Sequence, residues 1–189
     1  MTPAVAELGC VTGRFQPVHG QHLELVELAL QRCAHVLVAV TNPDTGARHT
    51  EPTSAHRHTG AANPFTYVER VWLLDAALRG AGLAEATTVV PFDLTRPQVW
   101  AEYVPLRARQ FVRVYSDWER EKADRLGAGG YPLTVLDGDP AAKVDATDIR
   151  AALTSGAGWE DLVPPAVVPV LRDLLYRVPM GERSAPVRR

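Results

Sequence analysis

Hydrophobic residues along the chain fall into two kinds of segment that alternate with one another. Short continuous apolar runs predict strands buried inside a sheet. These runs span residues 8–11, 35–40, 87–91, 111–115 and 131–136. Segments with apolar residues every three or four positions, or with residues that start helices, predict helices. They span residues 22–33, 66–81, 97–107, 118–126, 147–153 and 165–176.

Strands that alternate with helices predict an α/β fold built on a doubly wound, five-stranded parallel sheet. The 189 residues suit one domain over residues 1–178, with a small helical C-terminal part from about residue 146 to 178. We expect residues 179–189 to form a flexible tail. Residues 41–64 carry turn-forming residues and almost no large apolar side chain, which predicts a long surface loop.

Composition narrows the class of protein. The formal net charge of −2 offers no general attraction to nucleic acid or to an anionic membrane, so a polyanionic ligand needs a local site. The sequence contains no run of 18 apolar residues, so it predicts no membrane-spanning helix. Cys10 and Cys33 form no CxxC pair and fall in predicted buried elements, as expected for reduced packing residues of a cytoplasmic protein.

The segment that points to chemistry spans residues 13–22 and reads Gly-Arg-Phe-Gln-Pro-Val-His-Gly-Gln-His. It follows the first predicted strand and opens the first predicted helix, where free N–H groups and the helix dipole favour phosphate. His19 and His22 are three residues apart, so both imidazoles can face one anion. We expect partial protonation near neutral pH, which would let them follow charge that develops at a phosphate.

This segment resembles the signature GxFxPxHxGH of the nucleotidylyltransferase superfamily, and its first seven residues are most similar to those of archaeal-type nicotinamide mononucleotide (NMN) adenylyltransferases. Residues 63–70, Asn-Pro-Phe-Thr-Tyr-Val-Glu-Arg, are similar to that family's NPFTxxER element, and residues 147–150 to the end of its SGTxIR element. The resemblance implies a Rossmann-like sheet. It also implies transfer of a nucleotidyl group from a nucleoside triphosphate to a small acceptor, with Mg²⁺ as cofactor and release of pyrophosphate.

The resemblance also implies roles for individual residues. Those that would act on the phosphates during catalysis are His19, His22, Arg14 and Arg150. Those that would contact the nucleotide are Gly13, Phe15, Gln16, Ser116, Asp117, Trp118, Thr147 and Arg150. Trp118 either stacks on the base or packs in the protein, and the pair Glu69–Arg70 either serves the site or anchors the loop.

Donors in the predicted loop suit a small, highly anionic acceptor. They are Arg48, His49, His56, Arg57 and His58, of which we assign Arg48, His56 and His58, together with Arg70, to the acceptor. The three histidines either serve the acceptor or belong to an ordinary polar loop. They lack the cysteines of a typical zinc site, so we expect no zinc there and assign no metal-ligating residue.

Three departures from the family pattern bear on the substrates. Gly20-Gln21 stands where the family has Lys-Gly, and Asp145 stands where it has the first Ser of SGTxIR. Residues 116–118 replace an Asn-Pro near the nucleobase. With the donor-rich loop, these departures favour CTP over ATP, and a small phosphonate such as phosphonoformate over NMN. NMN adenylyl transfer is the alternative and a catalytically silent nucleotide-binding regulator a distant one; the oligomeric state stays open.

Overall fold

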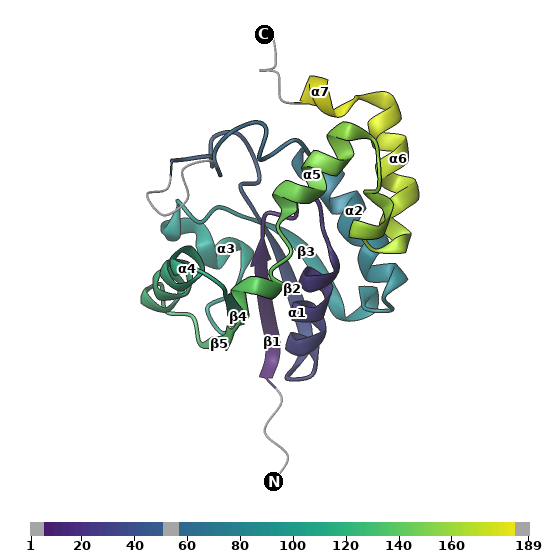
Figure 1. Ribbon diagram of the computed structural model, residues 1–189. Helices are drawn as coiled ribbons and strands as arrows, with labels where there is room; N and C mark the ends of the chain where they lie inside the picture. Colours follow the sequence, from purple (N-terminus) through teal and green to yellow (C-terminus); the bar gives the residue numbers. More distant parts are fainter. Residues whose placement is uncertain (1–5, 51–56, 184–189) are drawn as a thin grey trace.

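The computed structural model describes residues 6–50 and 57–183, in which a single sheet is covered by helices on both faces (Figure 1). Its strands are β1 (Ala6–Gly13), β2 (Cys33–Thr41), β3 (Thr87–Phe92), β4 (Arg109–Val114) and β5 (Leu133–Asp137). All neighbouring pairs are parallel, in the order β3-β2-β1-β4-β5. The predicted five-stranded, parallel, Rossmann-like sheet is therefore confirmed.

The helices bury two separate cores against the sheet. They are α1 (Gly20–Leu30), α2 (Tyr67–Gly80), α3 (Trp100–Tyr103), α4 (Asp117–Ala128), α5 (Ala146–Ser155), α6 (Val168–Arg177) and α7 (Met180–Arg183). One core joins side chains such as Val11 and Val38 to α1, α2, α5 and α6, and the other joins Cys10 and Ala39 to α3 and α4. Successive strand residues point to opposite faces, so continuous apolar runs fill both cores.

Two segments differ from the sequence prediction. The helix expected over residues 97–107 is a 3₁₀ turn, Pro97–Val99, followed by one α-turn that ends at Tyr103. Val104 is extended, with φ −132°, because the following Pro105 disfavours helical backbone there. Ordered chain also continues past residue 179, where we expected the tail to begin. Arg183 of α7 donates hydrogen bonds to the Glu69 carboxylate (2.8 Å) and the Leu174 carbonyl (2.6 Å).

Both cysteines are buried free thiols, as expected. None of the helices in the described part of the chain is long and apolar enough to cross a membrane.

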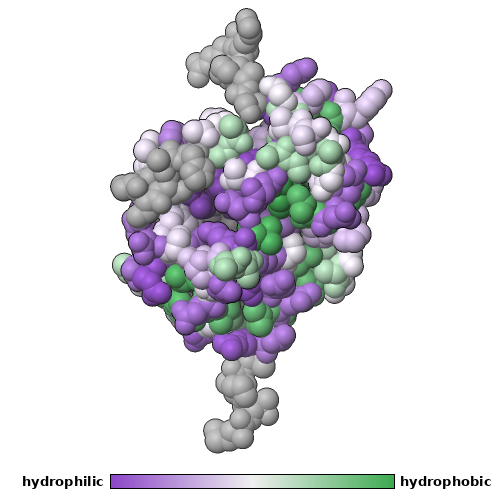
Figure 2. Space-filling model, viewed as in Figure 1, coloured by the Kyte–Doolittle hydropathy of each residue, from purple (hydrophilic) through white to green (hydrophobic). Residues whose placement is uncertain are grey.

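The sheet order places a crevice between β1 and β4. The chain leaves β1 toward β2 and β3 on one side, and later returns to β4 and β5 on the other. Ligands of open α/β sheets bind at such a switch point, outside the carboxyl ends of the strands. In Figure 1 this edge faces upward, toward α5 and the β2–α2 connection. The face seen in Figure 2 is hollowed near its centre, where hydrophilic side chains gather.

Candidate active site

The connection from β1 to α1 is shaped by the packing of Phe15 against Gly13. Phe15 adopts a left-handed backbone (φ 51°) that folds its ring back over Gly13. A Cβ on Gly13 would lie 2.8 Å from the ring, closer than real contacts allow, so a larger residue at this position would displace the Phe15 ring. The same ring meets His22 edge-on, with centroids 4.7 Å apart, and so supports that imidazole.

His19 and His22 lie side by side at the start of α1, with ring centroids 3.7 Å apart. The backbone N–H of His19, the N-cap residue, donates to Nδ1 of His22 at 3.2 Å. Because Nδ1 accepts, the proton of neutral His22 is on Nε2, which is therefore a donor. Both imidazoles line the cavity described below.

The two imidazoles are neutral at pH 7, contrary to the partial protonation expected from the sequence. Burial lowers the pKa of His19 to about 4, although the charge of Asp145 opposes the shift. Burial, and next the neighbouring His19, hold the pKa of His22 well below its usual value. Desolvation therefore outweighs the nearby carboxylate, and the pair offers uncharged N–H donors.

A cavity of about 340 Å³ opens above β1 and β4. Eight of the predicted site residues line it: Gly13, Arg14, Phe15, Gln16, His19, His22, Ser116 and Trp118. Asp117 is exposed and does not line it, because it lies on the outer side of the first turn of α4. Thr147 and Arg150 do not line it either.

Arg150 lies behind the cavity wall and joins two of its segments. The buried guanidinium donates to the Gln16 carbonyl and to Thr147 Oγ1, both at 3.0 Å. The Gln16 side chain in turn exchanges two hydrogen bonds with the backbone of Phe65 (2.9 and 3.0 Å). In this structure Arg150 and Thr147 thus hold the β1–α1 connection against the start of α5.

Asp145, one of the departures from the family pattern, is the N-cap of α5. Its carboxylate accepts from the backbone N–H of Thr147 at 2.7 Å. Burial would raise the pKa of this carboxyl, but hydrogen bonds from Thr147 and the charges of Arg150 and Lys143 outweigh it and lower the pKa. Asp145 is therefore an ionised helix cap that also lines the cavity.

Arg14 brings a concentrated positive charge to the cavity. Its NH1 group donates to the carbonyls of Arg57 (3.3 Å) and Ala62 (3.2 Å). Burial, followed by the charges of Arg57 and Arg150, lowers the pKa of Arg14 to about 9. It stays charged at neutral pH, and the crowding of cations would be relieved by a bound polyanion.

Arg70 does not contact the cavity, so its assignment to the acceptor is wrong for this structure. The side chain is fully buried and donates to the carbonyls of Arg14 (3.0 Å), Thr41 (2.8 Å) and Asn42 (2.8 Å). A guanidinium whose N–H donors are used by main-chain carbonyls connects segments of the chain and has no pair of donors available for a substrate. The anchoring alternative for Arg70 therefore fits the structure.

The donor-rich loop reaches the cavity through one of its expected donors. Arg48 and His58 do not line it, and His56 lies outside the described residues. Arg57 does line it, and its guanidinium lies 3.4 Å from the centroid of the Trp118 ring. The Nζ atom of Lys122 lies 5.4 Å from the same ring. Trp118 is thus in the cavity wall beneath two cations.

Sequence reasoning missed several polar residues of this wall, chief among them Lys122, Glu119 and Lys143. Burial lowers the pKa of Lys122 to about 8, so the ammonium is charged at pH 7. Glu119 accepts from Ser116 Oγ (2.5 Å) and Lys143 Nζ (2.9 Å). Lys122 follows Trp118 by four residues, so the two share a face of α4, and that spacing was the available signal.

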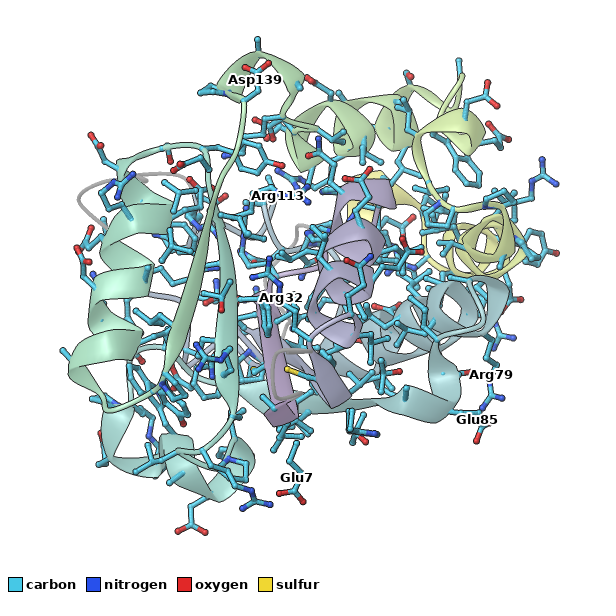
Figure 3. The ribbon with its side chains drawn as sticks, turned by 90° about the horizontal axis from the view of Figure 1, so that it is seen from below. Glu7, Arg32, Arg79, Glu85, Arg113 and Asp139 are labelled. Carbon is cyan, nitrogen blue, oxygen red and sulfur yellow. The ribbon has the colours of Figure 1, made fainter. Side chains whose placement is uncertain are left out.

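The departure at Gln21 is also structural. Its side-chain amide donates to the Ala142 carbonyl (2.7 Å) and accepts from the Val144 N–H (2.9 Å), which joins α1 to the segment before α5. Arg113 of β4 points toward α1 (Figure 3) and pairs with Glu24 at 3.1 Å. These contacts fix the side of the cavity opposite the donor-rich loop.

The carboxylates of the cavity wall suit Mg²⁺ only as an ion shared with a substrate. No group of three or more His, Cys, Asp or Glu side chains among the described residues could hold a metal ion. Asp145 and Glu119 each contribute one carboxylate to the wall. Mg²⁺ typically keeps several waters and takes one or two protein carboxylates plus phosphate oxygens, and this donor set fits that pattern.

Comparisons with known proteins find similar sequences over most of the chain. Residues 10–152 match the family described as cytidylyltransferase-like. A phosphonoformate cytidylyltransferase of Streptomyces viridochromogenes is 38% identical over 170 residues, which are 89% of this chain and 92% of that protein. A nicotinamide-nucleotide adenylyltransferase of Pyrococcus horikoshii is 31% identical over 170 residues, 88% of this chain and 83% of that protein.

A solved structure with a similar fold is a bifunctional NMN adenylyltransferase/ADP ribose pyrophosphatase from Francisella tularensis. It aligns with a TM-score of 0.68 and 16% sequence identity, over 94% of this chain and 52% of that one. The chain therefore spans about half the length of that protein, and the likeness concerns the fold.

Proposed function

The chain belongs to the cytidylyltransferase-like family, and from this premise we propose that it transfers CMP from CTP to a small phosphonate, with release of pyrophosphate. The observation that carries the proposal is the 38% identity, over nearly the whole chain, to an enzyme named for phosphonoformate. Relatives that act on nicotinamide nucleotide support adenylyl transfer to NMN as the second candidate, at 31% identity.

The proposed reaction is a single displacement at the α-phosphorus of CTP. A phosphonate oxygen of the acceptor forms a new bond to that phosphorus, and the bond from the α-phosphorus to the bridging oxygen breaks. Pyrophosphate leaves with the electron pair of the broken bond. Because the phosphonate oxygen is already ionised at neutral pH, the step needs no general base, and positioning with charge neutralisation supplies the acceleration.

The residues of the cavity would divide this work by position. The N–H donors of His19 and His22, at the start of α1, would bond the phosphate oxygens where negative charge develops. Arg14 and Lys122 would neutralise the polyphosphate. Trp118 would support the base or the acceptor by its ring. Asp145 and Glu119, the two carboxylates of the cavity wall, would help to hold a Mg²⁺ ion together with the nucleotide, and the ion would supply charge neutralisation when bound.

A grid of substrates tests the proposal. Purified enzyme would be incubated with Mg²⁺, with CTP or ATP, and with phosphonoformate, other small phosphonates or NMN, while pyrophosphate release is measured. The expected result is a kcat/KM at least 10-fold higher for CTP than for ATP, with a compact phosphonate as acceptor. Dinucleotide formation from ATP and NMN, with no product from CTP and any phosphonate, would replace the proposal with NMN adenylyl transfer.

A further inference from the structure

Gln21 holds the connection between β5 and α5 against the start of α1. This connection spans residues 138–145 and passes the first turn of α1 (Figure 1). Both Gln21 and Val144 line the main cavity, the space of about 340 Å³ above β1 and β4. Gln21 stands where the family pattern has glycine, which has no side chain for such contacts. The contacts of Gln21 therefore bear on what this particular chain binds.

The two backbone groups that Gln21 contacts are one acceptor and one donor. The Ala142 carbonyl accepts from Nε2 of Gln21 at 2.7 Å, and the Val144 N–H donates to Oε1 at 2.9 Å. Lys143, which lies between them, is extended (φ −64°, ψ 124°). In extended backbone the carbonyl before a residue and the N–H after it point to the same side. We call this pair of groups, the Ala142 carbonyl and the Val144 N–H, the backbone edge.

The backbone edge is complementary to a base that carries an amino group next to an unprotonated ring nitrogen. The carboxamide of glutamine places an N–H donor beside an oxygen acceptor. The 4-amino group and N3 of cytosine, or the 6-amino group and N1 of adenine, present a donor and an acceptor at nearly the same spacing. Uracil and guanine present the reverse pattern, a carbonyl next to a ring N–H. Both groups of the backbone edge would then face a group of their own kind and stay unpaired.

Gln21 can leave the backbone edge without burying an unpaired polar group. Its side chain is only partly buried, so it can turn to solvent and keep its amide hydrated. The Tyr115 hydroxyl, which donates to Oε1 at the longer distance of 3.3 Å, also accepts from Arg113 at 3.3 Å and lines the main cavity. Because an entering amino base replaces the two bonds of Gln21, hydrogen bonds are exchanged and not lost, and the net cost is small.

We propose that Gln21 occupies the place of a nucleobase: its carboxamide closes the backbone edge before the nucleotide binds, and an amino base displaces it. Gln21 is then a specificity-determining residue, because a base must offer the same donor and acceptor as the carboxamide in order to replace it. The inference rests on the proposed cytidylyl transfer and adds to it how the base of the nucleoside triphosphate is selected.

Binding of CTP and UTP in the absence of an acceptor tests the proposal, because no transfer can then occur. Wild-type enzyme is expected to bind CTP at least 10-fold more tightly than UTP in a calorimetric titration. Gln21→Ala removes the competing carboxamide, so this ratio of affinities should rise about 10-fold further, the scale of two net hydrogen bonds. A general loosening of residues 138–145 in the variant would change both affinities alike and leave the ratio as it was.

Two further variants separate hydrogen bonding from bulk. Gln21→Met keeps the length of the side chain but cannot bond to the backbone edge, so it should raise the ratio as Gln21→Ala does. Gln31→Ala removes the same kind of side chain from the opposite, exposed end of α1 and should leave the ratio unchanged. A ratio in Gln21→Ala at or below that of wild type, or a wild-type ratio in Gln21→Met, would overturn the inference.

The side-chain amide of Gln21 can also be followed by NMR, and its signal is identified by its absence from the spectrum of Gln21→Ala. CTP should move this signal to the chemical shift of a hydrated glutamine amide, and UTP should leave it near its original position. A signal that CTP does not move would show that the carboxamide stays on the backbone edge, and displacement would be refuted.

ATP and GTP distinguish failure of this inference from failure of the proposed function. The two purines differ at the same edge as CTP and UTP do. If ATP is the true donor, Gln21→Ala should raise the ratio of ATP to GTP affinity, and the role of Gln21 stands although cytidylyl transfer falls. If CTP proves to be the substrate but Gln21→Ala leaves the ratio of CTP to UTP affinity unchanged, cytidylyl transfer stands and the inference is overturned.

Discussion

Replacement of His22 tests whether the neutral imidazole pair acts on the reaction or only shapes the start of α1. His22→Ala removes the Nε2–H donor that we assign to the transition state, and loss of one such donor typically costs about 10²-fold to 10³-fold in kcat. It also leaves the His19 N–H without its acceptor at Nδ1 (3.2 Å). Loss of a helix-start hydrogen bond costs about 1 kcal/mol, or about 2–4 °C in Tm for a protein of this size.

The variant His22→Asn separates these two effects. A short side-chain oxygen at this position, three residues after the N-cap His19, can still accept from the His19 N–H. The asparagine amide is too short to reach the place of Nε2. We therefore expect Tm to return toward wild type in His22→Asn, while kcat for pyrophosphate release stays about 10²-fold low.

The control is His35→Asn, a histidine on β2 that contacts Thr88 and lies outside the cavity. It should leave kcat unchanged. A kcat near wild type in His22→Asn would refute a direct role for the imidazole and leave it only a structural one.

Three further results are expected. Arg150→Ala should raise the KM of CTP about 10-fold and spare the acceptor KM, because Arg150 fixes the Gln16 carbonyl and the start of α5; an effect on the acceptor alone would contradict this. Arg70→Ala should lower the free energy of unfolding in urea by about 3 kcal/mol or more, because buried carbonyls lose their donors, and Arg70→Lys should recover little. Between pH 6.5 and 4 the unfolded chain binds a proton at His19 that the folded protein does not bind. The free energy of unfolding should therefore decrease by up to about 3 kcal/mol as the pH is lowered from 6.5 to 4, and His19→Asn should make this decrease smaller.

Local sequence patterns were enough to predict the five strands, because apolar runs and helical periods reflect burial that each segment encodes by itself. His19 and His22 were singled out by the motif of residues 13–22, and the structure brings their rings together at the start of α1; their role toward phosphate stays a prediction. The helix after Pro97 was predicted too long because the restriction that Pro105 places on Val104 was not applied.

The features of the cavity that the sequence did not predict depend on contacts between segments that are distant in the sequence. Arg70 has the type of side chain that often binds an anionic substrate. Only in the folded chain do the carbonyls of Arg14, Thr41 and Asn42 surround it and accept its hydrogen bonds. The helix that carries Lys122 has a high density of charges typical of a solvated surface. The burial that lowers the pKa of His19 and keeps it neutral could not be predicted from the sequence either, because this burial depends on the walls of the cavity.

Hydrogen-bonded side chains hold the donor-rich loop at both of its ends, which suggests how the preference for an acceptor could change while the main cavity stays the same. Arg70 fixes the beginning of the connection at Thr41 and Asn42, and the Gln16–Phe65 pair fixes its end. Insertions between fixed ends cost little, because loop-closure entropy grows only slowly with length. The segment between these anchors can therefore change in length and sequence while its two ends stay fixed against the sheet, and transplanting it between relatives would test whether it sets the preference for an acceptor.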